Sequence, residues 1–340
     1  MDVTFTEEQE ALRAAVRHLL TDHCTSERIR KVMVSDTGAD LELYRRLVEV
    51  GVTDLPGLVE LGAVLEECGR AIAPVPLVSV AGIAAPALQT AGLHDVVAGL
   101  RAGEALPILA LDGEATLRGG TVSGVFHHVP EAGIASLIAL VASDGGQPRL
   151  VVVDPSDARV EVLPTMDMTR RLCTVRLDGA AVLADGPAGQ GWAARTAAEL
   201  HGTAALSYEL VGVAQACLDM AVAHARSREQ FGRPIGAYQA ISHRCADMFV
   251  LVESARSHAY YAGWAVREGT PDAALAASQA KAAAGDAAVA CAEGAIQIHG
   301  GIGFTWEHDL HLYLRRARSG AALLGTPSAH RRRIADLMGV

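Results

Sequence analysis

Two glycine-containing turns carry the residues whose types and spacing could do chemistry. In the first, "SREQFGRPIGAYQ" at 227–239, the cation Arg228 precedes the amide of Gln230, the ring of Phe231 and a glycine. A guanidinium binds phosphate through paired hydrogen bonds, and a glycine lets another group approach the backbone closely. The same spacing fits an ordinary helix turn with a surface arginine, so the residues alone leave both interpretations open.

The second turn, "QIHGGIGFTWEHD" at 297–309, places Gln297 before the glycine pair Gly300 and Gly301. Exposed amides of such glycines can hold an anion, whereas the simpler interpretation of the pattern is a helix C-cap. The turn follows a helix rather than a strand, so it is neither the dinucleotide motif GxGxxG nor a Walker A loop. The turn contains His308, and His311 stands two residues after its end. No third ligand is evident, so we expect no metal site.

A third stretch, "RRARSGAALLGT" at 315–326, lacks a reactive group. Three arginines lead into small and apolar residues that end with Leu324, Gly325 and Thr326. No side chain after the arginines exchanges a proton near neutral pH. If the chain forms an enzyme site here, its acid or base must come from elsewhere.

The composition limits the classes of protein to consider. The chain has 340 residues, half of them hydrophobic, and a formal charge of −10. A chain without a basic face is not expected to bind nucleic acid. Six cysteines without a CxxC pair indicate reduced thiols, the acidic N-terminus is unlike a signal peptide, and no apolar run reaches the roughly 18 residues of a membrane span. We therefore expect a cytoplasmic protein with no membrane partner.

Hydrophobic periodicity predicts the elements that must position the turns. A capping box formed by Thr6 and Gln9 starts a first hundred residues with helical spacing. Valine-rich runs between Gly- and Pro-containing turns then predict a compact antiparallel β unit. Long helices resume after it, interrupted at Gly269 and Gly300, and Pro271 is expected at the first position of one of them.

These elements predict a mainly α, α+β fold in three parts. We expect an N-terminal helical domain over 1–104, a middle β domain over 105–184 and a C-terminal helix bundle over 185–340.

Together the two turns resemble the motifs of the acyl-CoA dehydrogenase family. The family patterns R-x-[QT]-F-G-x-P-I-x-x-[FY]-Q and Q-x-x-G-G-x-G match Arg228–Gln239 and Gln297–Gly303. The order of helices, β unit and helices also matches, so the resemblance covers essentially the whole chain. It implies an N-terminal helical domain, a middle β-barrel and a C-terminal four-helix bundle.

The resemblance also implies an activity and a cofactor. Members hold FAD and oxidise an acyl-CoA to the trans-2-enoyl-CoA, with electron-transfer flavoprotein as the expected acceptor. Hydrogen bonds to the thioester carbonyl acidify the α-proton, a placed glutamate removes it, and the flavin accepts hydride. The matching motif positions reach the pyrophosphate and adenine end of a neighbouring subunit's FAD. In this chain they are Arg228, Gln230, Phe231, Gln297, Gly300 and Gly301.

Three departures from the family concern the other half of its site. Leu324 stands where most members carry the glutamate, and the alternative position on the first bundle helix falls on Gly202. The sequence "LALDGEATLRGG" at 109–120 replaces a T-E-P-x-x-G-S-D loop, and the N-terminal domain lacks an E-E-Y-G-G segment. Glu199 and Glu209 lie near Gly202 in sequence, but helical geometry directs them elsewhere and we expect both on the surface.

This pattern resembles the short subunits of α2β2 acyl-CoA dehydrogenases of steroid-degrading bacteria. In those enzymes a partner chain carries the base, one FAD serves each heterodimer, and the substrates are bulky, such as steroid side-chain CoA thioesters. We therefore expect a base-lacking subunit that needs a second acyl-CoA dehydrogenase chain. Two alternatives stay open, namely a homomeric enzyme with Glu209 or Glu199 as a relocated base, and a non-enzymatic scaffold with the same fold.

Overall fold

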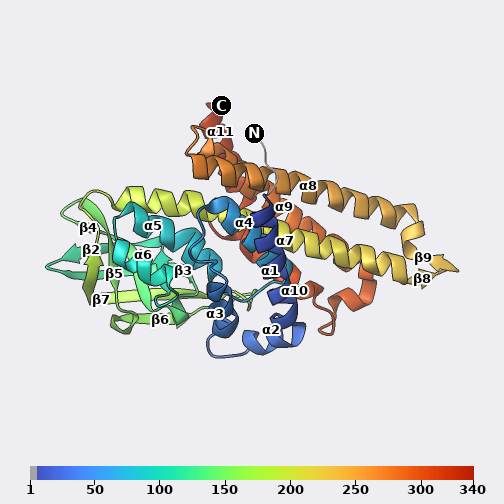
Figure 1. The fold of residues 1–340 in the computed structure, drawn as a ribbon, viewed down its shortest axis with the longest axis horizontal. Coiled ribbons are helices and arrows are strands. Elements are labelled where there is room, and N and C mark those ends of the chain that lie inside the picture. The colour runs from blue at the N-terminus through green and yellow to red at the C-terminus, as the bar shows by residue number, and fades with distance from the viewer. Residues whose placement is uncertain (1–5) are drawn as a thin grey trace. The chain divides into compact units, whose positions relative to one another are not determined.

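The computed structural model describes residues 6–340 and has helices toward both ends of the chain with strands between them (Figure 1). This order is the one that the sequence predicts. The chain forms two compact units. The bundle unit comprises the residues up to Ser26 with Gly57–Ala73 and Thr203–Val340, and the sheet unit comprises Glu27–Pro56 and Pro74–Gly202. The three-domain division at 104/105 and 184/185 stays a prediction.

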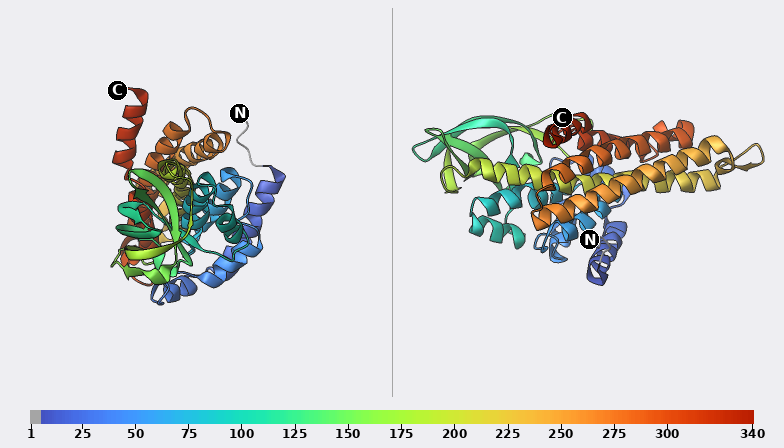
Figure 2. Two further views of the ribbon diagram at one scale, coloured as in Figure 1. Left: turned by 90° about the vertical axis from the view of Figure 1, so that its left-hand side faces the viewer. Right: turned by 90° about the horizontal axis from the view of Figure 1, so that it is seen from above.

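Long antiparallel helices build the bundle unit, as expected. They are α1 (Glu7–His23), α4 (Leu58–Arg70), the part of α7 (Gly191–Ser227) after Gly202, α8 (Gln239–Glu268), α9 (Ala273–His299), α10 (Leu310–Ala322) and α11 (Pro327–Met338). In this unit α7, α8 and α9 run alongside one another in every view (Figure 2). Their buried faces are rich in alanine, for example Ala214, Ala259 and Ala288, and such small side chains let helices approach closely.

Two glycines bring the backbones of α4 and α7 into direct contact. A Cβ at Gly69 would lie 2.0 Å from the carbonyl oxygen of Glu209, and a Cβ at Gly212 would lie 1.9 Å from that of Glu66. Any side chain at either position would force the helices apart. This crossing holds the middle of α7, where Glu209 lies, inside the bundle unit.

The helix ends follow the sequence signals closely, with one exception. Thr6 and Gln9 form the predicted capping box, and Gly269 ends α8 in the left-handed conformation. Pro271, however, is not at the first position of α9, which begins at Ala273. The Asp272 carboxylate accepts hydrogen bonds from Tyr261 and Thr270, at 2.5 and 2.6 Å, and this turn delays the helix by two residues.

The sheet unit combines short helices with a small closed sheet. Its helices are α2 (Ser26–Met33), α3 (Leu41–Glu49), the π-helical turn η1 (Val78–Ala84), α5 (Ala85–Thr90), α6 (His94–Arg101) and the start of α7. Its strands are β1 (Pro107–Ala110), β2 (Asp112–Arg118), β3 (Thr121–Pro130), β4 (Leu137–Asp144), β5 (Gln147–Val153), β6 (Ala158–Val162) and β7 (Leu172–Asp185). The pairing runs β4–β2–β3–β7–β5 and returns from β5 to β4, so the sheet closes on itself.

The expectation of a purely antiparallel sheet is wrong for β4, which pairs in parallel with both β1 and β2. Strand β1 pairs with β4 in parallel, from Pro107 opposite Leu137 to Ala110 opposite Leu140. All four residues of β1 are buried, which is typical of parallel strands, and the alternation that marks a half-exposed strand is therefore missing from its sequence.

Helix α7 is the one element among the described residues that has the length and composition of a membrane span. In its most apolar window, however, 78% of the residues are buried in the structure, as in the core helix of a globular protein.

Candidate cofactor site

The first predicted turn forms a β-hairpin beyond the end of α7. Strands β8 (Glu229–Gln230) and β9 (Arg233–Pro234) pair, and Phe231 with Gly232 makes the turn between them. Both turn residues have positive φ, 52° and 79°, as a two-residue hairpin requires. Glycine adopts this conformation freely, but phenylalanine does so at a cost in free energy. Phe231 is 92% exposed, so the strained residue displays its ring outward rather than into the core.

Arg228 lies between α7 and this hairpin with its charge free. Its backbone N–H donates to the carbonyl oxygen of His224 at 2.9 Å, while its exposed guanidinium has no ion-pair partner within residues 6–340. The hairpin is held instead by Tyr238. The Tyr238 hydroxyl donates to the Gln230 carbonyl oxygen at 3.1 Å, and its ring centroid lies 4.1 Å from the guanidinium carbon of Arg233.

The second predicted turn caps α9 and leaves the space beside two of its glycines open. Gly300 has φ 64° and ψ −140°, which only glycine adopts readily, and its N–H donates to the carbonyl oxygen of Gln297. A Cβ at Gly300 or Gly301 would meet nothing within 4 Å, whereas one at Gly303 would lie 2.9 Å from the carbonyl oxygen of Ile296. Gly303 is therefore required for packing, while Gly300 and Gly301 are open to an approaching group.

Histidine rings join the two turns at one end of the bundle unit. His224, one turn before Arg228, stacks on His299 with ring centroids 4.2 Å apart, and His308 meets His299 edge-on at 4.6 Å. The sequence interpretation considered His308 only as a metal ligand and did not consider His224 or His299. His224 lies four residues before Arg228, and His299 directly precedes Gly300. These positions are the sequence signals that could have identified them.

The stretch at 315–326 that has no acid or base covers the end of α10 and the closed turn that follows it. Leu324 has φ 56°, and its carbonyl oxygen lies 3.0 Å from the Nε2 atom of His330, whose ring is 4% exposed. Fully buried Lys281 donates from Nζ to the carbonyl oxygens of Ala321 and Gly325, at 2.9 Å each. These contacts satisfy the last carbonyl oxygens of α10. The Leu324 side chain itself has no group that could exchange a proton.

Burial sets the protonation of this turn. It lowers the pKa of the Lys281 ammonium to about 7, because the charged form loses its hydration. Burial, followed by the charge of Lys281, lowers the pKa of His330 to about 4. At neutral pH the His330 ring is thus uncharged and can donate from Nε2 to the Leu324 carbonyl oxygen.

The expectation that Glu209 lies on the surface is wrong. Glu209 is 2% exposed and accepts a hydrogen bond from Nη1 of Arg316, which is 1% exposed, at 2.5 Å. The helical distance from Gly202 gives no sign that α10 supplies a buried partner for Glu209. In the sheet unit, Glu199 is partly exposed and pairs with Arg195 at 2.8 Å, one turn earlier on α7.

The sequence that stands in place of the family's T-E-P-x-x-G-S-D loop also forms regular structure. Residues 112–118 form β2 and pair with β3, and a tight turn at 119–120 follows, so no loop replaces the missing motif.

Within residues 6–340 no group of three or more His, Cys, Asp or Glu side chains is placed to hold a metal ion. His308 instead accepts from the Leu310 N–H at 3.2 Å, and His311 packs against Trp306.

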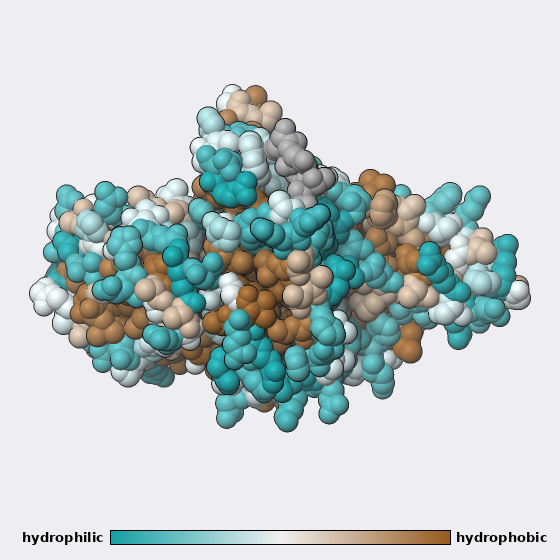
Figure 3. All heavy atoms as spheres, in the orientation of Figure 1, coloured by the Kyte–Doolittle hydropathy of each residue, from teal (hydrophilic) through white to brown (hydrophobic). Residues whose placement is uncertain are grey.

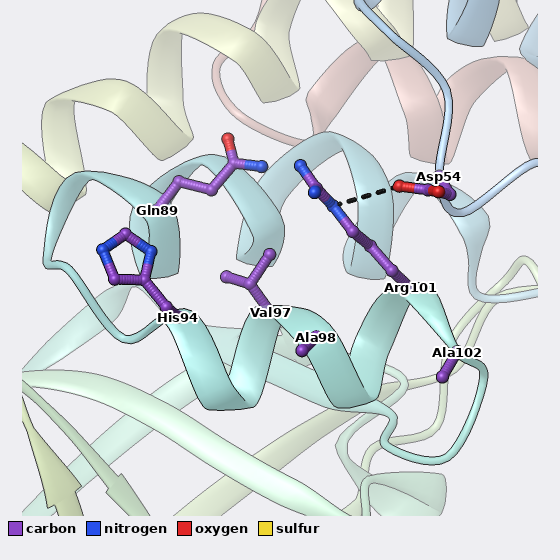
Figure 4. Close-up of a pocket in the computed structure, with 7 residues that line it drawn as sticks. All are labelled: Asp54, Gln89, His94, Val97, Ala98, Arg101 and Ala102. Carbon is purple, nitrogen blue, oxygen red and sulfur yellow. Dashed lines mark ion pairs between the residues drawn. The ribbon is translucent and has the colours of Figure 1, made fainter.

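A surface hollow of about 760 Å³ lies in the sheet unit, over α6 and the segment that follows α3 (Figure 4). It is lined by Asp54, Gln89, His94, Val97, Ala98, Arg101 and Ala102. Arg101 points toward Asp54 and pairs with it at 3.3 Å. Its charge is thus neutralised, unlike that of Arg228, and none of the predicted site residues lies here.

Comparisons with known proteins agree with the sequence motifs. Residues 180–339 match the family model for the C-terminal domain of acyl-CoA dehydrogenases. The chain is 36% identical to the acyl-CoA dehydrogenase IpdE2 of Mycolicibacterium smegmatis, over 97% of this chain and 98% of that protein. It is also 36% identical to IpdE2 of Mycobacterium tuberculosis, over 98% of each chain.

Solved structures show the same likeness in three dimensions. The ChsE4–ChsE5 complex from Mycobacterium tuberculosis contains a chain with a TM-score of 0.92 and 26% identity, covering 100% of this chain and 99% of that chain. The Tcur3481–Tcur3483 steroid ACAD gives a TM-score of 0.88 at 30% identity, over 98% of each chain. The predicted fold, with N-terminal helices, a middle sheet and a C-terminal bundle, is confirmed, and the chain belongs to the acyl-CoA dehydrogenase family.

Proposed function

We propose that this chain is the base-lacking subunit of a heteromeric acyl-CoA dehydrogenase. It holds the pyrophosphate and adenine end of an FAD whose flavin ring lies against a partner chain, and the partner supplies the catalytic glutamate. The observation that carries the proposal is a contrast within one unit. Leu324 stands at the base position in a turn whose carbonyl oxygens accept hydrogen bonds, whereas exposed Arg228 has no ion-pair partner in the part of the chain that the structure describes.

The residues at the Arg228 end fit a dinucleotide cofactor. Arg228 offers a fixed cation for a phosphate, and the open space beside Gly300 and Gly301 allows a close approach of the same anion. Phe231 offers an apolar surface, and exposed Gln230 and Gln297 offer amides for polar groups of the adenosine. When bound, FAD supplies the acceptor for the hydride that leaves the β-carbon of the acyl group.

The surface around these turns supports an obligate partner. Exposed large hydrophobic residues of the bundle unit include Phe231, Phe249, Val250, Ile302, Phe304 and Trp306. Figure 3 shows hydrophobic patches among polar atoms on the face that carries α8. Large exposed apolar side chains are typical of interfaces, and we propose that a second chain of the same fold covers them and completes the FAD site.

The substrate and acceptor follow from the family. We propose a bulky acyl-CoA, such as a steroid side-chain CoA thioester, because the similar solved structures include a steroid ACAD. The shortened α3–α4 connection, residues 50–57, is consistent with a roomy pocket. Electron-transfer flavoprotein is the proposed acceptor. The free cysteines suit a reducing cytoplasm, where we propose that the complex works.

The alternatives receive less support from the described residues. A relocated base must exchange a proton with substrate, but the Glu209 carboxylate is buried against Arg316. Glu199 lies in a partly exposed i,i+4 pair with Arg195. A scaffold role would leave the free Arg228, the open glycines and the strained Phe231 without a purpose.

The chain purified alone provides the test. We expect little bound FAD and no dehydrogenase activity, and both should appear on co-expression with a family member that carries the base. An active, yellow homotetramer formed by this chain alone would overturn the proposal. Glu209→Gln and Glu199→Gln variants of such a homotetramer would then decide whether either carboxylate is the base.

A further inference from the structure

Three histidine rings pack together behind the two turns proposed to hold FAD. They come from three segments: His224 from the last turn of α7, His299 from the last residue of α9, and His308 from the segment before α10. His224 and His299 stack with an interplanar angle of 23°, and His308 meets His299 at 63°. His299 is 9% exposed and the other two rings are partly exposed.

Hydrogen bonds fix the protons of two of the rings. His299 Nδ1 lies 2.8 Å from the carbonyl oxygen of Ala295, so Nδ1 must carry a proton and donate it. His308 Nδ1 accepts from the backbone N–H of Leu310 at 3.2 Å, so this atom carries none. Nε2 of His299 therefore remains available for a proton.

Burial and neighbouring groups oppose protonation of His224 and His299 in the free protein, whereas a carboxylate residue stands on each side of His308 in the sequence. Arg228 follows His224 by one helical turn, and each ring faces another imidazole. Glu307 and Asp309 flank His308, and Asp309 accepts from the Ser26 hydroxyl at 2.7 Å. Burial, then Arg228 and His308, lowers the pKa of His224, and burial with the neighbouring rings lowers that of His299.

We propose that His224, His299 and His308, here called the histidine stack, are part of the polyphosphate site and take up a proton when a diphosphate diester binds there. The inference rests on the proposed function. Arg228 lies one turn beyond His224 and Gly300 follows His299, so an anion held between them lies within about 5–10 Å of the rings. Negative charge at that distance neutralises Arg228 and favours the imidazolium form.

FAD is a suitable probe because both phosphates of its pyrophosphate are esterified, so its charge stays constant near neutral pH. Any pH dependence of binding then reports on protons of the protein. Uptake of one proton strengthens binding by at most about tenfold per pH unit, between the pKa of the free ring and its higher value in the complex. A stack that serves only as packing would bind FAD equally at each pH.

The test measures FAD binding by fluorescence anisotropy, with a trace of FAD and increasing amounts of the intact chain at pH 8, 7 and 6 and constant ionic strength. We expect the association constant to rise about tenfold from pH 8 to pH 6. In the double variant His224→Gln/His308→Gln the rise should fall below about twofold. His299 is left in place because it is nearly buried and bonded to Ala295. His258→Gln is the matched control, since His258 is exposed on α8 and also contacts a backbone carbonyl oxygen.

The outcomes separate this inference from the proposed function. Binding that Arg228→Ala weakens, but that rises equally with falling pH in the wild type and the double variant, overturns the histidine stack alone. Binding that does not change with pH in the wild type does the same. Binding that Arg228→Ala leaves unchanged at every pH overturns the proposed FAD site. If the isolated chain gives no signal, the flavin-stripped co-expressed complex is titrated against the same criteria.

Discussion

The Arg228 end of the bundle unit and the Leu324 turn differ in how their polar groups are satisfied. At the Arg228 end an exposed cation has no ion-pair partner among residues 6–340, two glycines have open space beside them, and an aromatic residue is held in a strained conformation. At the Leu324 turn a buried lysine and a histidine saturate the carbonyl oxygens. Buried groups that satisfy one another's hydrogen bonds indicate a structural role, whereas exposed groups remain able to bind another molecule.

The largest expected effect concerns α10, which leads into the Leu324 turn. Arg316→Met leaves the Glu209 carboxylate buried without its cation and should lower the free energy of unfolding by about 3–5 kcal/mol. Urea denaturation measures this loss. Arg318→Met is the matched control, because the Arg318–Glu293 pair is half exposed and its removal should cost under about 1 kcal/mol. Equal losses in the two variants would contradict a buried structural role for Arg316.

Lys281 provides a second test of the closed turn. Lys281→Met deprives two buried carbonyl oxygens of a donor and should cost about 1–3 kcal/mol near pH 8. The other lysine of the chain, exposed Lys31, supplies the control Lys31→Met, for which we expect no measurable loss. A Lys281→Met protein as stable as the wild type would mean that the turn does not depend on these bonds.

The pH dependence of stability has a defined sign at Lys281. Its pKa in the folded chain, about 7, lies below the ordinary lysine value of 10.5, so the unfolded chain binds more protons between these two pH values. The free energy of unfolding of the wild type, relative to that of Lys281→Met, should therefore increase from pH 7 to pH 10. A difference that stays constant or decreases would contradict a buried lysine that loses its proton.

Phe231 tests the Arg228 end, where we expect a substitution to reduce flavin binding without reducing stability. Phe231→Asn replaces a bulky residue at positive φ by one that tolerates this conformation, so stability should stay constant or rise by up to about 1 kcal/mol. Flavin retention in the co-expressed complex should nevertheless fall, because the exposed ring is lost. A clear loss of stability with normal flavin content would show that Phe231 is a packing residue.

Much of the fold could be predicted from the sequence, because helix caps and periodicity are local signals. The capping box at Thr6, the end of α8 at Gly269 and the long α7 are confirmed. The parallel pairing of β1 could not be read, since a fully buried strand has no alternation. The partner of Glu209 could not be read either, since Arg316 is far away in sequence and meets it only in the folded bundle.

The candidate site, like the fold, has local parts that the sequence indicates and tertiary contacts that it does not. Arg228, Gln230, Phe231, Gln297, Gly300 and Gly301 lie in local turns, and the motifs alone identified them as candidates. The contact between His224 and His299, which joins the two turns, and the Lys281 contacts that close the Leu324 turn depend on the packing of α9 against other helices. Such contacts require the tertiary structure.

The flavin content of the co-expressed complex tests the central claim most directly. A charge-assisted phosphate contact contributes about 1.5–3 kcal/mol, so Arg228→Ala should weaken FAD binding by roughly 10- to 150-fold. We expect about one flavin per two chains in the wild type and in the nearby surface control Arg226→Ala, and a strongly depleted complex with Arg228→Ala. Full flavin occupancy in Arg228→Ala, with the complex intact, would contradict the account.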